Sequence, residues 1–121
     1  MVLVDTSIWI DHLRRGNPRL VELLTNEQVL CHPHVVGELA CGNLRKRQEI
    51  LVLLRALPTA PVADDEEVLH LLESKRLHGC GLGWIDAHLL ASALLSGSGF
   101  WTLDKQLERA AIRLKIPSPR F

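Results

Sequence analysis

The chain begins with Met1-Val2-Leu3-Val4-Asp5-Thr6-Ser7, an apolar run that ends in an acid and two hydroxyl residues. Consecutive apolar residues at positions 1–4 predict a short strand that is buried on both faces. The polar residues that follow can turn the chain and cap the start of a helix, in which Ile8, Trp9 and Leu13 would be the apolar positions. We therefore expect a buried strand that leads directly into a helix, which is the repeating unit of α/β proteins.

The alternation of strands and helices continues along the chain. We expect further strands at residues 29–31, 60–63 and 100–103, and helices at residues 8–13, 18–24, 35–40, 44–57, 64–77, 84–95 and 105–115. The helix at 84–95 is apolar nearly all round, so it is expected at the centre of the protein. This order predicts an α/β fold with a central parallel sheet flanked by helices, and at 121 residues the chain is expected to form a single domain spanning residues 1–121.

The composition is that of an ordinary globular protein, with 47% hydrophobic residues, 23% charged residues and a formal net charge of zero. The charge of the whole molecule gives no attraction for nucleic acid, which would have to be bound by local patches. The cysteines, Cys31, Cys41 and Cys80, form no Cys-x-x-Cys pair, so we expect reduced thiols in or near the core. No apolar run approaches the ~18 residues of a membrane span, and Asp5 interrupts the first run too early for a signal peptide. A cytoplasmic protein is expected.

Four carboxylates stand at the edge of apolar stretches or inside them, where acids are uncommon unless their charge is compensated. Asp5 and Asp104 each end an expected strand, and Glu38 and Asp86 lie early in expected helices. Strand ends and helix starts of a parallel sheet meet along one edge, so we expect the four side chains to converge. Close carboxylates repel one another by roughly 4 kcal/mol per pair at an effective dielectric near 20, and a bound cation would remove that repulsion. Hard oxygen donors in this number suit Mg²⁺ or Mn²⁺.

A divalent cation held by carboxylates is well suited to the attack of water on a phosphodiester bond. The chain has no Gly-x-x-x-x-Gly-Lys loop, so hydrolysis of nucleoside triphosphates is not expected. No set of cysteines and histidines has the spacing of a zinc site. A metal-dependent hydrolase is therefore the leading interpretation of the four acids.

Four segments of the chain resemble one family in their order and spacing. The sequence is similar to PIN-domain ribonucleases, specifically the VapC-type toxins of bacterial toxin–antitoxin pairs. The matching segments are Val2-Leu3-Val4-Asp5-Thr6-Ser7-Ile8-Trp9-Ile10-Asp11, Val36-Gly37-Glu38-Leu39-Ala40-Cys41-Gly42, Trp84-Ile85-Asp86-Ala87-His88-Leu89-Leu90-Ala91 and Thr102-Leu103-Asp104. They span nearly the whole chain, and each carries one of the four acids.

The resemblance implies a three-layer α/β/α PIN-like domain, divalent-metal-dependent endonucleolytic cleavage of RNA, a homodimer, and inhibition by a small cognate antitoxin protein. By the same resemblance, Asp5 and Asp86 look like the principal metal ligands. Glu38 and Asp104 look like the acids that complete the pocket, with or without an intervening water molecule. Thr6 and Thr102 match the hydroxyl positions beside such a site. The sequence departs from the family pattern at Leu107, where relatives often have an aromatic residue, and at His88, in a stretch that is usually apolar.

The candidate residues also have structural interpretations. Asp5 and Asp104 could cap the helices that follow them, and Glu38 could be an exposed helix residue. Basic side chains recur along the last helix and could guide RNA phosphates to the metal or could form a solvated face, the two being about equally supported. They are Lys105, Arg109 and Arg113. The scattered histidines are assigned no chemistry.

Other functions account less well for the sequence. A receiver-type phosphoacceptor domain would need an adjacent acidic pair after the first strand, and a haloacid-dehalogenase-like phosphatase would need Asp-x-Asp, whereas Asp5 is followed by Thr6 and Ser7. A catalytically silent PIN-like module that acts through its partner surface is the non-enzymatic alternative. The helix at 44–57 has the apolar run 50–54 on more than one face, which predicts contact with another part of the domain or with a second chain.

Overall fold

The structure is a computed structural model and describes residues 1–121. Three parallel strands form one sheet in the order β2-β1-β3. They are β1 (Val2–Val4), β2 (Val29–Leu30) and β3 (Gly99–Trp101). The central strand pairs Leu3 with Leu30 on one side and with Phe100 on the other. The predicted central parallel sheet is therefore confirmed.

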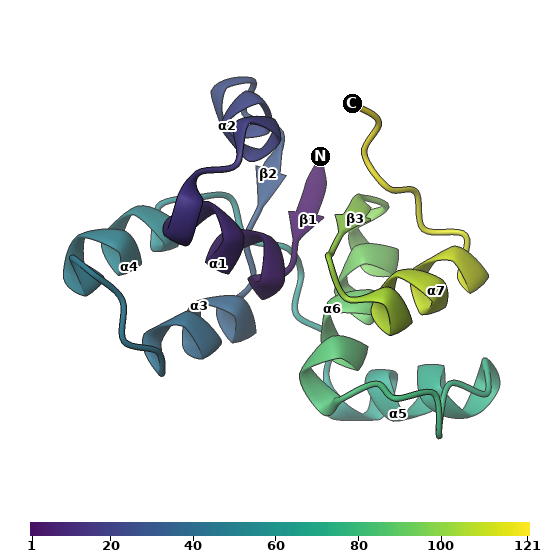
Figure 1. Ribbon diagram of the computed structural model, residues 1–121. Coiled ribbons are helices and arrows are strands. Elements are labelled where there is room, and N and C mark those ends of the chain that lie inside the picture. The colour runs from purple at the N-terminus through teal and green to yellow at the C-terminus, as the bar shows by residue number, and fades with distance from the viewer.

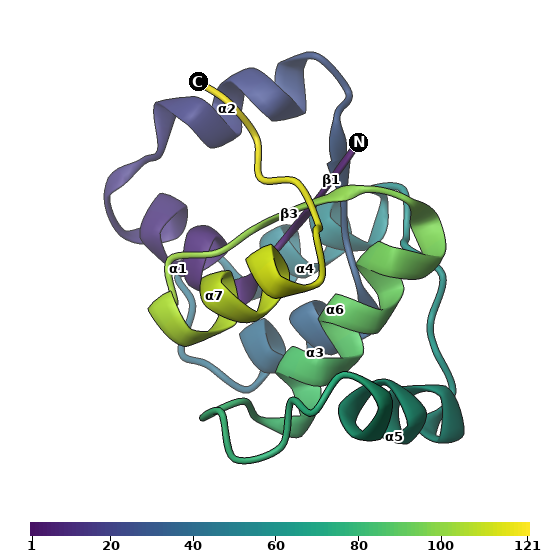
Figure 2. The same cartoon turned by 90° about the vertical axis from the view of Figure 1, so that its right-hand side faces the viewer.

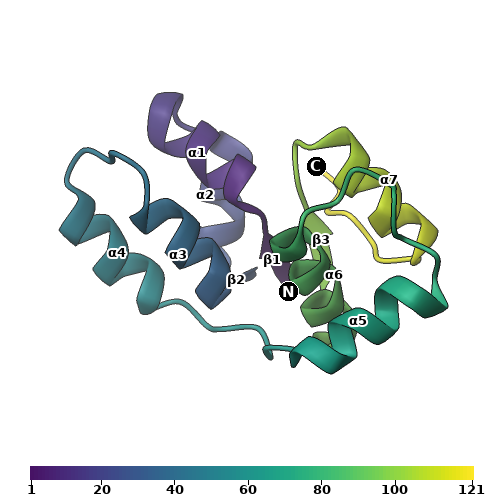
Figure 3. The same cartoon turned by 90° about the horizontal axis from the view of Figure 1, so that it is seen from below.

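Seven helices flank this sheet. They are α1 (Thr6–Arg15), α2 (Pro18–Thr25), α3 (Pro33–Ala40), α4 (Arg47–Arg55), α5 (Asp65–Ser74), α6 (Trp84–Ser96) and α7 (Lys105–Arg113). In Figure 1 the strands stand in the middle, α1 to α4 lie on the side of β2, and α5 to α7 lie on the side of β3. The view from below shows the same division (Figure 3). None of the helices combines the length and the apolar character needed to cross a membrane.

The core gathers around β1 and α6. All three residues of β1 are buried, as are all the residues of α6 from Ala87 to Ala93. Helix α6 runs beside β3 and contacts α5 (Figure 2), so it is covered on several sides. Its nearly uniform apolar composition is explained by this central position, as expected from the sequence.

Helix α5 begins with the predicted capping box, in which Asp64 and Glu67 each accept a hydrogen bond from the other's backbone N–H.

The expected strand at residues 60–63 does not form. Only a single bridge joins Thr59 to Cys31, which extends β2 by one residue. Ala60 donates to the Cys31 carbonyl at 2.9 Å, and Pro61 follows immediately. Because proline has no N–H, the ladder cannot continue through position 61.

The expected helix at residues 44–57 is shorter than predicted and begins at Arg47, because Lys46 adopts a left-handed conformation with φ 53°. Leu54 is buried, whereas the side chains of Val52 and Leu53 are 67% and 66% exposed.

The prediction of core or near-core thiols is wrong for Cys41, which is exposed just after the last residue of α3. Cys31 is buried and Cys80 is partly buried.

The C-terminal segment covers the outer edge of the sheet. Phe100 in β3 donates its N–H to the Pro117 carbonyl at 2.8 Å. The ring of Phe121 then lies 4.9 Å from that of Trp101 and under the Arg19 guanidinium of α2. Both ends of the chain are thus tied to the same three-stranded sheet.

Candidate active site

The carboxyl ends of β1 and β3 lie side by side and bring distant residues together. Val4 pairs with Trp101, so Asp5 and Thr102 each follow the last residue of neighbouring strands. Asp5 also donates its N–H to the Trp101 carbonyl at 2.9 Å. This edge of the sheet is where α/β folds place their functional groups.

Asp5 is only 6% exposed, and one of its two oxygens carries all of its hydrogen bonds. Oδ2 accepts from the hydroxyls of Thr102 and Ser7, each at 2.7 Å. The backbone N–H of Ser7 is 3.4 Å away, which is long for a helix cap. No protein group donates to Oδ1. The hydroxyls therefore set the orientation of Asp5 more strongly than the helix end does, and one oxygen stays available.

Ser7 is a site residue that sequence reasoning missed. Besides its bond to Asp5, its Oγ accepts the N–H of Leu103 at 3.0 Å and lies 3.3 Å from Thr102 Oγ1. It thus joins the start of α1 to the segment after β3. Only its position two residues after Asp5 could have suggested this role, because its other partners are nearly 100 residues away in sequence.

Glu38 lies on α3, and its side chain is fixed by a neighbouring helix. Thr6 Oγ1 donates to Glu38 Oε1 at 2.8 Å. Glu38 is exposed, as the structural interpretation expected, but it is held at the start of α1, next to Asp5. Oε2 of Glu38 has no protein donor. Thr6 therefore links the start of α1 to the Glu38 side chain on α3.

Asp86 is half-buried at the start of α6, where its Oδ2 accepts the Gly83 N–H at 2.9 Å. Burial raises the pKa of Asp86, the Gly83 hydrogen bond opposes this, and the negative charges of Asp5 and Asp104 raise the pKa further. Asp5 and Asp104 therefore lie close enough to Asp86 for their charges to act on its carboxyl group. Proximity of like charges is the electrostatic condition under which a cation is attracted.

Asp104 is exposed and caps α7, as the structural interpretation proposed. Its Oδ1 accepts the N–H groups of Gln106 and Leu107 at 2.9 and 3.1 Å. Its own N–H donates to Thr102 Oγ1 at 3.0 Å, the same hydroxyl that binds Asp5. Thr102 therefore links two of the four acids, and Oδ2 of Asp104 has no protein donor.

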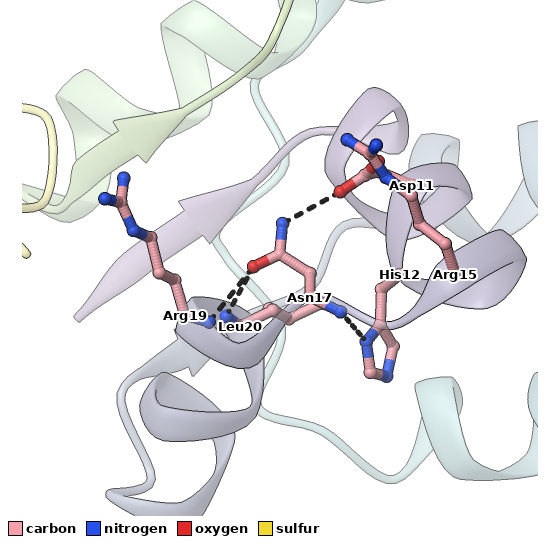
Figure 4. Close-up of polar contacts among 6 residues, drawn as sticks. All are labelled: Asp11, His12, Arg15, Asn17, Arg19 and Leu20. Carbon is pink, nitrogen blue, oxygen red and sulfur yellow. Dashed lines mark hydrogen bonds and ion pairs between the residues drawn. The ribbon is translucent and has the colours of Figure 1, made fainter.

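All four acids use one oxygen to hold their position and leave the other without a protein partner. A nearby aspartate behaves differently: Asp11 accepts from Arg15 at one oxygen and from Asn17 at the other (Figure 4). The Arg15 hydrogen bond lowers the pKa of Asp11. Asn17 also accepts the N–H groups of Arg19 and Leu20, so this network joins α1 to α2 and is structural.

The donor set at the sheet edge fits a hard divalent cation, because it consists of carboxylate oxygens with mutual repulsion. No group of three or more histidine, cysteine, aspartate or glutamate side chains is arranged to hold an ion by itself.

The basic residues of α7 differ from one another. Arg113 donates to the Lys75 carbonyl at 3.0 Å and to Cys80 Sγ at 3.7 Å, so it fastens α7 to the segment after α5. Lys105 and Arg109 are exposed and form no salt bridge or hydrogen bond with another residue. These two are better candidates for binding RNA than Arg113.

A buried histidine links two of the helices that carry acids. His32 caps α3, where its Nδ1 accepts the His34 N–H at 3.0 Å, and its Nε2 lies 3.0 Å from Ser92 Oγ on α6. Burial and the nearby charges of His34 and His88 lower the pKa of His32 to about 4. The ring is therefore neutral, with its proton on Nε2. This role of His32 could not be inferred from the sequence, because Ser92 is 60 positions away along the chain.

The chain is similar to known proteins over most of its length. A family model described as PIN domain matches residues 2–113. The chain is similar to Ribonuclease VapC32 of Mycobacterium tuberculosis, strains CDC 1551 / Oshkosh and ATCC 25618 / H37Rv. To each it is 50% identical over 111 residues, which is 91% of this chain and 90% of the relative.

Proposed function

Because this chain belongs to the PIN-domain family, we propose that it is a divalent-metal-dependent endoribonuclease and the toxin of a toxin–antitoxin pair. The observation that carries this proposal is the state of Asp5, which is almost fully buried, held at Oδ2 by two hydroxyls and without a protein partner at Oδ1. A buried carboxylate with a free oxygen is unfavourable unless a cation or a hydrogen-bond donor joins it. The relatives named Ribonuclease VapC32 support RNA as the substrate.

Asp5 and Asp86 are the proposed direct ligands of Mg²⁺, with Mn²⁺ as the alternative ion. Glu38 and Asp104 complete the pocket through water. When bound there, the cation would polarise the scissile phosphate and lower the pKa of a water molecule.

The protein's own residues have separate tasks in this proposal. Thr102 and Ser7 hold Asp5 in one orientation, and Thr6 holds Glu38 beside it. The carboxylates repel the phosphate until a cation compensates them, so substrate and metal are expected to bind together. Lys105 and Arg109 supply positive charge for the RNA backbone on the helix that Asp104 caps.

The partners proposed are a second copy of the chain and a small cognate antitoxin. The exposed apolar residues Val52 and Leu53 support a homodimer. An antitoxin could inhibit by placing a basic side chain near Asp5, Glu38 and Asp86, where it would compete with the metal. A cytoplasmic location follows from RNA as the substrate.

The proposal is tested by RNA cleavage with purified protein. Activity should be lost with a chelator and recovered with Mg²⁺ or Mn²⁺, and Asp5→Asn should abolish it without loss of fold. Glu22→Gln on α2 is the matched control, since Glu22 is exposed and forms no salt bridge. Full activity of Asp5→Asn at saturating Mg²⁺ would reject the site. A well-folded parent protein that cleaves no RNA but binds a partner would favour the silent binding module.

A further inference from the structure

A cleft of about 480 Å³ lies between α7 and the loop that precedes α6. Gly79 and Gly81 line it on the loop side, and Gln106, Arg109 and Arg113 line it on the helix side. None of the roles assigned above uses Gln106 or the two glycines. The cleft is open to solvent and large enough to accept a nucleobase with its neighbouring phosphate.

The wall formed by Gly81 depends on the absence of a side chain. A Cβ added at position 81 would overlap the Gln106 amide group, and Gly81 has a φ of +80°, which favours glycine. The Gln106 amide therefore lies directly against the loop backbone. It has no hydrogen-bond partner in the protein, so its donor and its acceptor are both available to a ligand.

The charge in the cleft is positive and is not balanced locally. Arg109 and Arg113 both line it, no acidic residue does, and neither arginine forms a salt bridge. Arg113 already donates to the Lys75 carbonyl, so Arg109 is the cation in the cleft whose side chain has no protein partner. Two arginines without a carboxylate in a protein of zero net charge favour an anionic ligand.

Both walls of the cleft are joined to acids of the candidate active site. Gln106 donates its N–H to Asp104 Oδ1 at 2.9 Å. On the loop side, Gly83 donates its N–H to Asp86 Oδ2 at 2.9 Å, two residues after Gly81. The two chain segments that form the cleft therefore also hold Asp104 and Asp86, although neither acid lines the cleft itself.

We propose that this cleft is a nucleotide subsite for the RNA substrate, in which Gln106 reads the edge of an unpaired base and Arg109 binds its phosphate. An amide offers an adjacent donor and acceptor, which is the pattern that base edges present. Unpaired bases are the usual targets of sequence-specific RNA recognition. An acidic peptide would use the arginines alone and would leave the amide without a matching partner, so RNA accounts for more of the cleft. The inference rests on the ribonuclease function proposed above and adds base selectivity to it.

Binding is tested with four short RNA oligonucleotides that differ only in one central base. They are titrated by fluorescence anisotropy against the non-cleaving Asp5→Asn protein, alone and combined with Gln106→Ala or Arg109→Ala. The amide contact should give about a tenfold range of affinity among the four RNAs, and Gln106→Ala should reduce that range to less than about twofold. Arg109→Ala should weaken the binding of all four RNAs equally. It should also lower the slope of log affinity against log salt concentration by about one.

Gln48→Ala and Arg55→Ala on α4 are the matched controls. They should change neither the range of affinity among the four RNAs nor the salt dependence of binding. Melting temperatures check the fold of each variant. A base preference that survives Gln106→Ala would overturn the inference, as would an acidic peptide that binds the cleft more tightly than RNA. The cleavage sites of the parent protein and of Gln106→Ala, with Asp5 intact, separate the two proposals. RNA cut at the same sites by both contradicts the subsite only, whereas no cleavage and no binding by the parent contradicts the ribonuclease function too.

Discussion

Thr102 donates its hydroxyl to Asp5 Oδ2 at 2.7 Å, although the two residues are 97 positions apart in the chain. The same hydroxyl accepts the N–H of Asp104 at 3.0 Å. One threonine after β3 therefore orients the acid after β1 and the acid before α7. Groups that orient metal-binding side chains in this way commonly affect metal affinity and activity strongly.

Replacing Thr102 by valine is expected to reduce RNA cleavage by about 10- to 100-fold, because Asp5 loses a donor while the shape of the side chain is kept. Thr102→Ser retains the hydroxyl and should restore most of the activity. The measurement is kcat/KM for an RNA oligonucleotide over a range of Mg²⁺ concentrations. Equal activity of the valine and serine variants would show that the hydroxyl is not needed.

Asp86→Asn is expected to abolish cleavage and, without metal, to raise the melting temperature at neutral pH. The pKa of Asp86 is raised in the folded protein, so its ionisation opposes folding, and stability falls as the pH rises through that pKa. An amide removes both the burial of a charge and its repulsion with Asp5 and Asp104. Thermal unfolding in a chelator between pH 4 and pH 8 measures the effect. A melting temperature below that of the parent at every pH would contradict it.

Addition of Mg²⁺ or Mn²⁺ should raise the melting temperature of the parent protein. An ion that binds only the folded state, present at a concentration of 100 times its Kd, raises the free energy of unfolding by about 2.7 kcal/mol. Asp86→Asn should respond much less, since it lacks one proposed ligand, whereas Glu22→Gln should respond like the parent. A shift of equal size in all three proteins would indicate binding elsewhere.

His32 should make the stability depend on pH in the acidic range. Its pKa is lowered from 6.5 to about 4 in the folded state, so the unfolded chain takes up the proton first as the pH falls. The stability that neutral His32 contributes is complete above about pH 6.5 and is lost progressively toward pH 4, by an amount of the order of 3 kcal/mol. His32→Asn can still cap α3 but does not titrate, so its unfolding free energy should vary less between these values. An identical pH dependence in parent and variant would exclude this assignment.

The homodimer is expected to depend on α4. Changing Val52 and Leu53 together to serine should convert a dimer into a monomer at micromolar concentration, because both side chains are largely exposed in the single chain. Leu69→Ser on α5 is the control, since Leu69 is 46% exposed and lies on another helix. Light scattering measures the mass, with and without the product of the neighbouring gene. A parent protein that is strictly monomeric and purifies without a partner would contradict the expectation.

The features that local patterns encode were predictable from the sequence. Apolar residues before Asp5 and before Asp104 predicted the two neighbouring strands, and Asp64 with Glu67 predicted the start of α5. The second strand was expected at residues 100–103, but β3 ends at Trp101. The missing strand at 60–63 shows the limit of this approach, because apolar residues there obscured the effect of Pro61. The order of the strands, β2-β1-β3, brings the last strand beside the first and could not be obtained from local patterns.

The four acids of the candidate site could be identified from the sequence, but most of the side chains that orient them could not. Asp5, Glu38, Asp86 and Asp104 stand out as acids among apolar residues. Ser7 and His32 do not, because each acts through a partner that is 60 or more positions away. The different roles of Arg109 and Arg113 on one helix likewise depend on the Lys75 carbonyl. Side chains that work through distant contacts need the folded structure to be recognised.

The pairing of β1 with β3 also determines when the site can exist during synthesis. Asp5 emerges from the ribosome among the first residues, but Thr102 and Asp104 emerge among the last, after α6 has been made. A nascent chain therefore carries Asp5 and Glu38 without the strand that orients Asp5 and without the last acid. For the proposed ribonuclease, we therefore expect the growing chain to stay inactive while it is still attached to the ribosome and to the messenger RNA that encodes it.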